Sequence, residues 1–501
     1  MTDRPSPAER AAALQQEPQA RFDLDAETAD PGAARGITLV DIFATRDHDY
    51  DRLHDLVAAG IARASSPWSV AYNAMPGSLC DIDLQGGTFV LNRPLRIERC
   101  QLITLRNGTL VAGPDFPEGE FLISAHKVTA LSFVDLFLEC AKRASGLYLE
   151  DFFRVRVEDC HIIHQRDYGI YSAPRGNNHE LEVFKCHVSE FLYWDGYPKK
   201  KSSYGIIPPF DVDENRVSTG IFLGQADNVV ADCNINLCRV GIHCGMRANR
   251  IVGNHITGGG SLALDIFKGI EANNFGKSSA IINHNYIDNC TLWINCDDHE
   301  RLNARNYFHV TDNLFYRGYN HPADGRLWSH IVINALKPGS RLGNVHICDN
   351  LFYNQDENLE GLKPRILYPL RVHTPTDPET GVEGSLDHSG VTNFRMESNQ
   401  FTNRFPTFEQ PMGTTVTKTV AVRAGKADYF VGFREEIPVG ALAHASAELC
   451  ALASGTPRPP IVRKLHPHGV TVELPDPFDG EIRVTATTRT HSSNKFPYTV
   501  A

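Results

Sequence analysis

Residues 230–256 read VADCNINLCRVGIHCGMRANRIVGNHI, and this stretch decides the fold. It begins with VADCNI and ends with VGNHI, two copies of a motif in which apolar residues flank a turn containing Cys or Asn. Between them, VGIHC alternates with a period of two, which indicates a short strand rather than a helix. The stretch therefore predicts a unit of strand, turn and strand.

The motif recurs along the chain at irregular intervals. Its eight copies centre on Cys160, Cys186, Cys233, Asn254, Asn285, Asn313, Asn350 and Asn399. Neighbouring copies are 21 to 49 residues apart, as expected for a solenoid whose longer repeats contain loop insertions. Parallel strands of successive coils stack about 4.8 Å apart, so the Asn side chains would form an inward hydrogen-bonded ladder, with Cys in the apolar coils. We assign this ladder a structural role.

A second strand follows each ladder turn, and its alternation assigns the faces of the solenoid. We expect the inward positions to be Leu147, Ile170, Ile221, Ile242, Leu264, Leu292 and Ile331. The outward positions between them are Tyr148, Tyr171, Phe222, His243, Asp265, Trp293 and Val332. Asp265 is supplied by a strand expected at 263–267. Because the coils stack in register, the outward residues should form one exposed row.

The remaining segments suggest how the chain is divided. Residues 37–64 have the apolar spacing of a helix that caps the first coils, and residues 37–405 form the predicted solenoid, with its longest insertion at 190–219. Residues 1–36 are polar and contain proline, which favours a flexible arm. Residues 416–501 combine Val/Thr alternation with Pro-Asp and Asp-Gly turns, which predicts a small β-rich C-terminal domain.

The order of these elements resembles a known superfamily. After the helix, LQGGTFVLNRPLRI at 84–97 has the form GGT-x-V-x-N-x-P-L-x-I and is followed by the Asn-containing coils. Together they resemble the pectate-lyase-like superfamily, which includes family 28 glycoside hydrolase-related proteins and phage tailspike enzymes. The resemblance implies an all-β, right-handed parallel β-helix solenoid that acts on carbohydrate or binds it. Because the superfamily contains lyases, hydrolases, epimerases, fructotransferases and non-catalytic fibres, it leaves the reaction open.

Composition and charge restrict the partners and the location. Asp and Glu total 60 against 49 Lys and Arg, a net charge of -11 that argues against a nucleic-acid partner. No apolar run reaches the roughly 18 residues of a membrane span, and the polar N-terminus lacks a Sec signal peptide. The twelve cysteines include no CxxC pair, so we expect reduced thiols after cytoplasmic synthesis, compatible with a phage-like particle or non-classical export.

The outward row supplies the first candidate site. Large aromatic residues side by side on a surface mark binding sites, and flat ring faces suit sugars. The candidate substrate-binding residues of the row are Tyr148, Tyr171, Phe222 and Trp293. Asp265 is the carboxylate placed in the row, and we expect it to be catalytic, with His243 as an oriented base or as a neighbour that tunes its pKa. Loops covering the row would instead make these residues local core.

A pair of aspartates supplies the second candidate. Asp297 and Asp298 follow the LWIN strand. In family 28 hydrolases, an Asp-Asp pair at a strand end activates water while another Asp donates a proton, and the resemblance implies this role for Asp297 and Asp298. The Gly-His-Gly and Arg-Ile-Lys elements of that family are absent from the sequence. A solvated turn is the alternative interpretation.

Lyase chemistry needs a different set of residues. A base must remove the proton beside a uronate carboxyl, and a positive group must stabilise the charge that results. Lys268, Arg247 and His243 are the candidates for substrate binding and proton removal in that case. The calcium aspartates and the Arg-x-Pro-x-x-Arg motif of pectate lyases are not found, and no motif indicates an organic cofactor or a metal site.

We therefore predict a carbohydrate-active enzyme that cleaves or rearranges glycosidic bonds. The proposed mechanism uses carboxylates on the outer face of the β-helix, with Asp265 acting together with Asp297 or Asp298. One alternative is a polysaccharide lyase. The other is a non-catalytic glycan-binding fibre, for which we expect a homotrimer.

Overall fold

A computed structural model describes residues 49–64, 80–190, 218–258, 268–275, 278–288, 290–298, 307–316, 328–353, 366–377, 380–388, 391–402, 415–434, 437, 439–452 and 457–488. The predicted arm at 1–36 and most of the predicted insertion at 190–219 lie outside these ranges. Within them, the structure consists of one α-helix and 33 strands joined by turns.

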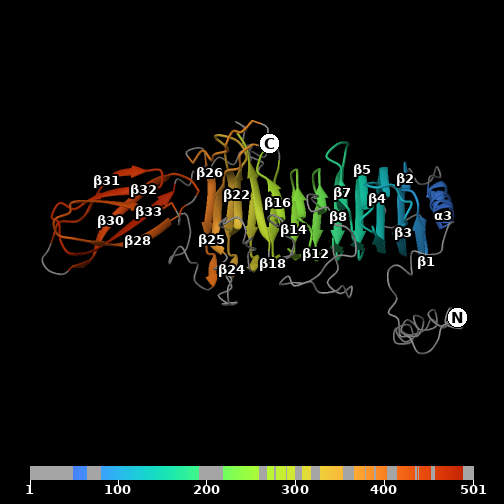
Figure 1. The fold of residues 1–501 in the computed structure, drawn as a ribbon, viewed down its shortest axis with the longest axis horizontal. Helices are drawn as coiled ribbons and strands as arrows, with labels where there is room; N and C mark the ends of the chain where they lie inside the picture. Colours follow the sequence, from blue (N-terminus) through green and yellow to red (C-terminus); the bar gives the residue numbers. More distant parts are fainter. Residues whose placement is uncertain are drawn as a thin grey trace, which may run out of the picture. The chain divides into compact units, whose positions relative to one another are not determined.

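Helix α3 (Asp49–Ala64) packs on the first strand of the solenoid, β1 (Cys80–Leu91; Figure 1). Leu53 and Val57 are four residues apart, so they lie on one helical face, and both are buried. Gly60 continues this face, and an added Cβ would lie 2.5 Å from the Ile82 side chain, so the helix and strand approach closely. This is the predicted cap, of which 37–48 lies outside the described residues. No helix in the described ranges is long and apolar enough to cross a membrane.

The solenoid strands form three columns, and consecutive coils follow one another along the solenoid in sequence order (Figure 1). Column one contains β2 (Leu95–Glu98), the first parts of β4 (Phe121–Glu139) and β5 (Ser145–Glu158), β7 (Tyr168–Ser172), β10 (Thr219–Leu223), β13 (Val240–Cys244), β16 (Lys268–Asn273), β19 (Thr291–Cys296), β22 (Trp328–Ala335) and β25 (Ile366–His373).

Columns two and three complete each coil. Column two contains the first parts of β1 and β3 (Gln101–Ala112), middle and later parts of β4 and β5, β8 (His179–Phe184), β11 (Val229–Ala231), β14 (Asn249–Val252), β17 (Ala280–Asn283), β20 (Phe308–Thr311), β23 (Gly343–Cys348) and β26 (Thr392–Glu397). Column three contains the ends of β1, β3 and β4, β6 (His161–Ile163), β9 (His187–Ser189), β12 (Asn234–Asn236), β15 (His255–Thr257), β18 (Tyr286–Asp288), β21 (Leu314–Tyr316), β24 (Leu351–Tyr353) and β27 (Gln400–Thr402).

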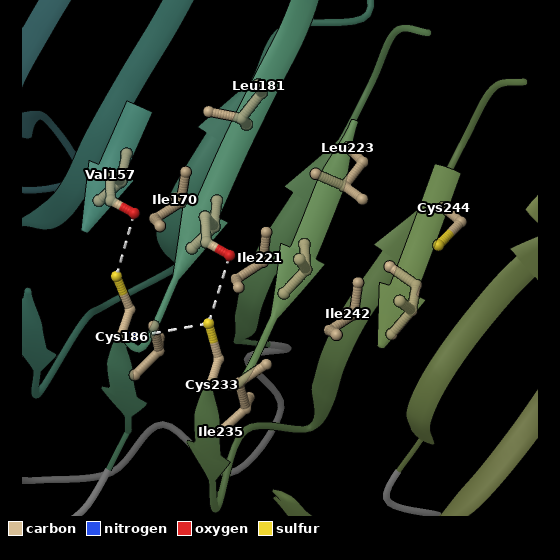
Figure 2. Close-up of a cluster of buried hydrophobic side chains, with 14 of the residues drawn as sticks. Val157, Ile170, Leu181, Cys186, Ile221, Leu223, Cys233, Ile235, Ile242 and Cys244 are labelled. Carbon is tan, nitrogen blue, oxygen red and sulfur yellow. Dashed lines mark hydrogen bonds between the residues drawn. The ribbon is translucent and has the colours of Figure 1, made fainter. Parts of the chain in front are cut away.

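The strand pairing confirms the predicted parallel β-helix. Between the first and last coils, the strands pair in parallel with their equivalents one coil before and one coil after, as β10 does with β7 and β13. The predicted inward residues that the structure describes are at most 1% exposed: Leu147, Ile170, Ile221, Ile242, Leu292 and Ile331. Figure 2 shows three of them, Ile170, Ile221 and Ile242, on successive strands. The predicted inward Leu264 lies outside the described residues.

The predicted inner ladder is present at the turn before column three. The backbone N–H of Asn254 donates to Asn285 Oδ1 at 3.0 Å, and the side-chain Nδ2 of Asn254 donates to the same oxygen at 2.9 Å. The same pair of bonds links Asn285 to Asn313 and Asn313 to Asn350. Each of these asparagines thus satisfies a buried backbone N–H of the preceding coil, which water cannot reach.

Cysteines occupy the same position in the earlier coils. Cys186 Sγ donates to the Val157 carbonyl at 3.5 Å, and the Cys186 backbone N–H points to Cys233 Sγ at 3.4 Å (Figure 2). All twelve cysteines are free, and ten are buried. In the apolar interior, burial raises the pKa of the Cys244 thiol to about 12, so that thiol stays neutral.

A glycine column begins the strands of column one. Its members are Gly146, Gly169, Gly220, Gly241 and Gly269. A Cβ added at Gly220 would lie 2.6 Å from the Gly241 carbonyl oxygen, and one at Gly169 would lie 2.5 Å from that of Gly220. Only glycine allows the backbones of successive coils to approach this closely.

The C-terminal region forms two antiparallel sheets of its own. One contains β28 (Thr415–Val422), β33 (Gly480–Thr488) and β30 (Leu442–Leu452), and the other contains β29 (Asp428–Gly432), β32 (Gly469–Glu473) and β31 (Ile461–His466). Val431, Val470 and Val484 belong to a buried cluster separate from that of the solenoid. The β-rich C-terminal structure predicted from the Val/Thr alternation is therefore present.

Candidate functional site

The strand register defines the outward row of column one. In coil order it consists of Tyr148, Tyr171, Phe222, His243, Glu271, Trp293, Val332 and Arg371. The predicted placement of Tyr148, Tyr171, Phe222 and His243 in one row is confirmed. The position predicted for Asp265 is occupied by Glu271, which pairs with His243 on one side and Trp293 on the other. Asp265 itself lies outside the described residues, and its catalytic role stays a prediction.

The outward carboxylate was predicted on the wrong segment for a simple reason. The sequence at 263–267 alternates like a strand, but it lacks the glycine that begins the neighbouring strands of column one. Gly269 belongs to the glycine column, and Gly269-Ile270-Glu271 aligns with Gly241-Ile242-His243. The close approach of backbones at the glycine column thus identifies Glu271 as the outward carboxylate.

The first four members of the outward row form a stack of rings. The ring centroids of Tyr171 and Phe222 are 4.8 Å apart with planes at 20°, and those of Phe222 and His243 are 4.7 Å apart with planes at 1°. Tyr148 stacks on Tyr171 at 5.7 Å. Because the rings cover one another's faces, they present mainly their edges outward, and the expectation of flat faces open to sugar rings is wrong for Tyr171 and Phe222.

At the end of this stack, Tyr148 combines an aromatic ring with a polar edge. Burial and then the hydrogen bond from its hydroxyl to Glu150 Oε2, at 2.8 Å, raise the pKa of Tyr148 to about 12. The hydroxyl therefore stays protonated at neutral pH. The stack thus offers hydrogen-bonding edges as well as apolar surface.

The centre of the outward row is a charged cluster around Glu271, which we call the Glu271 cluster. Glu271 Oε2 lies 3.2 Å from His243 Nδ1, and Glu271 Oε1 lies 2.5 Å from Lys268 Nζ. Asn295 Nδ2 donates to the same Oε1 at 3.1 Å. The side chains of Glu271 and His243 are 13% and 18% exposed, so these interactions are largely shielded from water. Lys268 and His243, both predicted from the sequence, are therefore brought together around Glu271.

The charge state of Glu271 follows from these contacts. Burial raises the pKa of the Glu271 carboxyl, but the hydrogen bond from His243, the Lys268 ion pair and the Asn295 amide outweigh this effect and lower it to about 2. Glu271 is thus an anion at neutral pH and only accepts hydrogen bonds. In the tautomer of His243 that donates from Nδ1 to Glu271, Nε2 is the acceptor of the ring.

Trp293 lies in the outward row but is not exposed. Only 4% of Trp293 is accessible, and its outward neighbour Val332 is 2% exposed. Lys268 Nζ lies 4.9 Å from the indole ring centroid, and His373 contacts the ring edge-on at 5.6 Å. The prediction of an exposed Trp293 is therefore wrong, because side chains from neighbouring coils cover the ring.

The other predicted site residues lie apart from the Glu271 cluster. Asp297 follows the end of β19 and is 7% exposed, and its backbone carbonyl accepts from the Arg341 N–H at 2.8 Å. Asp298 is half-exposed and pairs with Lys337 Nζ at 3.1 Å. By register, Asp297 stands about 13 Å further along the strand direction than Glu271. Arg247 lies in the bend after β13, and its described contacts do not include Glu271 or His243.

A second row of polar residues beside the Glu271 cluster was not predicted. Asn273, Asn295 and Asn334 pair in register on β16, β19 and β22, and we call them the outer asparagine ladder. Asn334 Nδ2 donates to Asn295 Oδ1 at 2.8 Å, and Asn295 Nδ2 donates to Asn273 Oδ1 at 3.1 Å. The sequence signal was present, because an Asn stands two residues after each row position on these three strands.

In the described ranges, no three His, Cys, Asp or Glu side chains form a group that could hold a metal ion.

Comparisons with known proteins agree with the fold. No protein-family model matches the chain. A segment of 184 residues is 26% identical to the polygalacturonase QRT3 of Arabidopsis thaliana, and the match covers 35% of this chain and 35% of that relative. The chain thus spans about a third of the length of this curated relative.

Two phage tailspikes are among the similar solved structures. Tailspike gp61 of Pseudomonas phage phi297 has a TM-score of 0.35 and 11% identity, covering 77% of this chain and 66% of that chain. A mutant tailspike of E. coli bacteriophage HK620 in complex with a pentasaccharide has a TM-score of 0.39 and 10% identity. The match covers 83% of this chain and 82% of that chain. The fold assignment rests on the strand register. The repeat pattern and the strand register establish a parallel β-helix fold, and the polygalacturonase match is consistent with the resemblance of the chain to the pectate-lyase-like superfamily.

Proposed function

We propose that this chain is a carbohydrate-active enzyme that binds a poly- or oligosaccharide on the outward face of column one and breaks a glycosidic bond there. The Glu271 cluster is the observation that supports this proposal most strongly. It joins a largely buried carboxylate to His243 and Lys268 beside a stack of aromatic rings. The polygalacturonase name of the Arabidopsis relative supports a glycan substrate.

In the proposed mechanism, His243 Nε2 is the atom that transfers a proton. Glu271 holds the ring through Nδ1 and stabilises the imidazolium that forms when Nε2 takes up a proton. Lys268 Nζ pairs with the other carboxylate oxygen of Glu271 and supplies a positive charge next to the reacting group. Glu271 thus acts as a positioning residue for His243, while His243 is the catalytic residue.

The proposal allows two reaction classes with different requirements. Elimination needs one base and one nearby positive charge, which His243 and Lys268 supply. Hydrolysis by the usual route needs two carboxyl groups about 5 to 10 Å apart. Asp265, Asp297 and Asp298 remain the proposed second group for that route, and by register Asp297 stands about 13 Å from Glu271 along the strand direction.

A screen of purified protein against glycans tests the proposal. The panel contains polygalacturonate, neutral plant polysaccharides, fructans and bacterial surface glycans, and each reaction is followed by new reducing ends and by the ultraviolet absorbance of unsaturated uronates. Reducing ends alone indicate hydrolysis, and both signals together indicate elimination. In either case, His243→Gln should lose the activity, whereas Asn234→Ala, an exposed substitution on column three, should keep it. Cleavage by His243→Gln at the wild-type rate would contradict the mechanism.

One observation favours a second function, glycan binding without cleavage. Glu271 already receives hydrogen bonds or ion pairs from His243, Lys268 and Asn295, so its lone pairs are engaged as in a structural ion pair. A protein of this kind would bind a glycan of the panel saturably and release no product. We propose that it would then be a homotrimer, which a mass measurement in solution tests.

A further inference from the structure

We propose that Asn273 and His243 together form a subsite above Gly245 that binds a hydroxyl group of the glycan. The inference rests on the proposed function and deepens it by naming the atoms that hold the sugar. It comes from the orientation of the outer asparagine ladder, which the predicted site did not include.

Glu271 fixes the direction of the ladder. A carboxylate anion only accepts hydrogen bonds, so Asn295 must turn its Nδ2, not its Oδ1, toward Glu271 Oε1. Asn295 Oδ1 then faces Asn334, which donates to it at 2.8 Å. The second hydrogen on Asn295 Nδ2 goes to Asn273 Oδ1 at 3.1 Å. Asn273 therefore presents its oxygen to the following coil, and its Nδ2 is a donor that Asn295 does not use.

Gly245 is the neighbour of Asn273 on the preceding coil. Cys244 pairs with Ala272, so the next position in the same register joins Gly245 to Asn273. Gly245 has no positive φ, so its backbone conformation does not require glycine. A Cβ added there would lie 3.7 Å from His243 Nε2 and 3.2 Å from the Leu223 carbonyl oxygen. The missing side chain thus leaves a small space beside Nε2.

His243 Nε2 lies beside this space and Asn273 stands next to it by register, and the two side chains define the class of ligand. Because His243 Nδ1 faces Glu271, Nε2 is an acceptor, whereas Asn273 Nδ2 is a donor. Among the described residues, the side-chain hydrogen bonds of His243 and Asn273 are made by His243 Nδ1 and Asn273 Oδ1, the other atoms of these two groups. A hydroxyl group satisfies both, since it accepts from Asn273 and donates to His243. A carboxylate would leave Nε2 unpaired, and an ammonium group would leave Asn273 Nδ2 unpaired.

Chemical modification of His243 in the full chain tests the subsite. Diethyl pyrocarbonate acylates accessible neutral imidazole nitrogens, and mass spectrometry of the peptide containing His243 reports its rate. The probes are polygalacturonate, a neutral polysaccharide and a bacterial surface glycan. We expect a bound glycan to slow the reaction in the wild type. In Asn273→Asp, which still accepts from Asn295 but cannot donate, protection should need about ten times more glycan.

Further variants separate the subsite from general effects. Asn273→Ala also removes the donor, but without adding a charge. Asn234→Ala is the matched control that should behave as wild type. Gly245→Leu should slow the modification even without glycan, because it fills the space beside Nε2. Equal protection of wild type and both Asn273 variants would overturn the subsite and leave the proposed function standing. Failure of every glycan to protect the wild type would overturn the proposed function, and rapid modification of Gly245→Leu would overturn the position assigned to the subsite.

Discussion

The solenoid contains two asparagine ladders with the same spacing and different environments. In the inner ladder, Asn285 is 1% exposed, its oxygen accepts from the backbone and side chain of Asn254, and its Nδ2 donates to Asn313 and to the Ile251 carbonyl. In the outer ladder, Asn295 bonds to a carboxylate, and the next amide, Asn273, has a donor for which no described residue is the acceptor. The inner ladder, saturated inside the turn, stabilises the fold, whereas the outer ladder ends at Asn273 with a donor for the proposed ligand.

The largest expected effect is on the inner ladder. Asn285→Ala should lower the free energy of unfolding by about 4 kcal/mol, because the Asn254 N–H and the Ile251 carbonyl would both be left buried without partners. Denaturant unfolding measures this change, and Asn234→Ala should shift the midpoint little. A loss below about 1 kcal/mol for Asn285→Ala would contradict the structural role of the inner ladder.

The two ladders should also differ in their response to pH. The pKa of Glu271 is lowered from its usual 4.5 to about 2, so its contacts stabilise the fold fully above pH 4.5, and this contribution is lost as the pH falls toward 2. This difference between the usual and the lowered pKa of Glu271 corresponds to about 3 kcal/mol of stability. The stability difference between wild type and Glu271→Gln should therefore shrink by about this amount between pH 5 and 2. The effect of Asn285→Ala on stability should not change over the same pH range. A stability difference between wild type and Glu271→Gln that stays constant with pH would contradict the charge assigned to Glu271.

The glycine column should respond to substitution for a steric reason rather than through lost hydrogen bonds. Gly220→Ala should lower the free energy of unfolding by about 2 kcal/mol, because the new methyl group would meet the Gly241 carbonyl at 2.6 Å. Thermal or denaturant unfolding measures the change. An unaltered stability would mean that successive coils can separate at this column at no cost.

Much of the solenoid could be predicted from the sequence because it depends on local patterns. Alternation placed Ile170, Ile221 and Ile242 inside, and the recurring turn motif predicted the ladder through Asn285. These patterns report directly on which face of a strand is buried. The same reasoning brought His243 into the outward row.

The candidate site was predicted less completely, for physical reasons. Two segments could each serve as the strand after the turn at Gly258, and alternation alone selected 263–267 rather than 268–273. The burial of Trp293 depends on Lys268 and His373 in neighbouring coils, whose side-chain directions no spacing rule gives. The outer asparagine ladder depends on the charge of Glu271, and it could not be recognised before that residue was placed in the row.

The most direct test of the account is the catalytic efficiency of Glu271→Gln on the glycan that the screen identifies. Glutamine keeps the shape of the side chain but removes the charge that orients His243. The account predicts a loss in kcat/KM of at least about 100-fold at neutral pH, with a folded protein. A Glu271→Gln variant that cleaves the glycan at the wild-type rate would contradict the assignment of the Glu271 cluster as the active site.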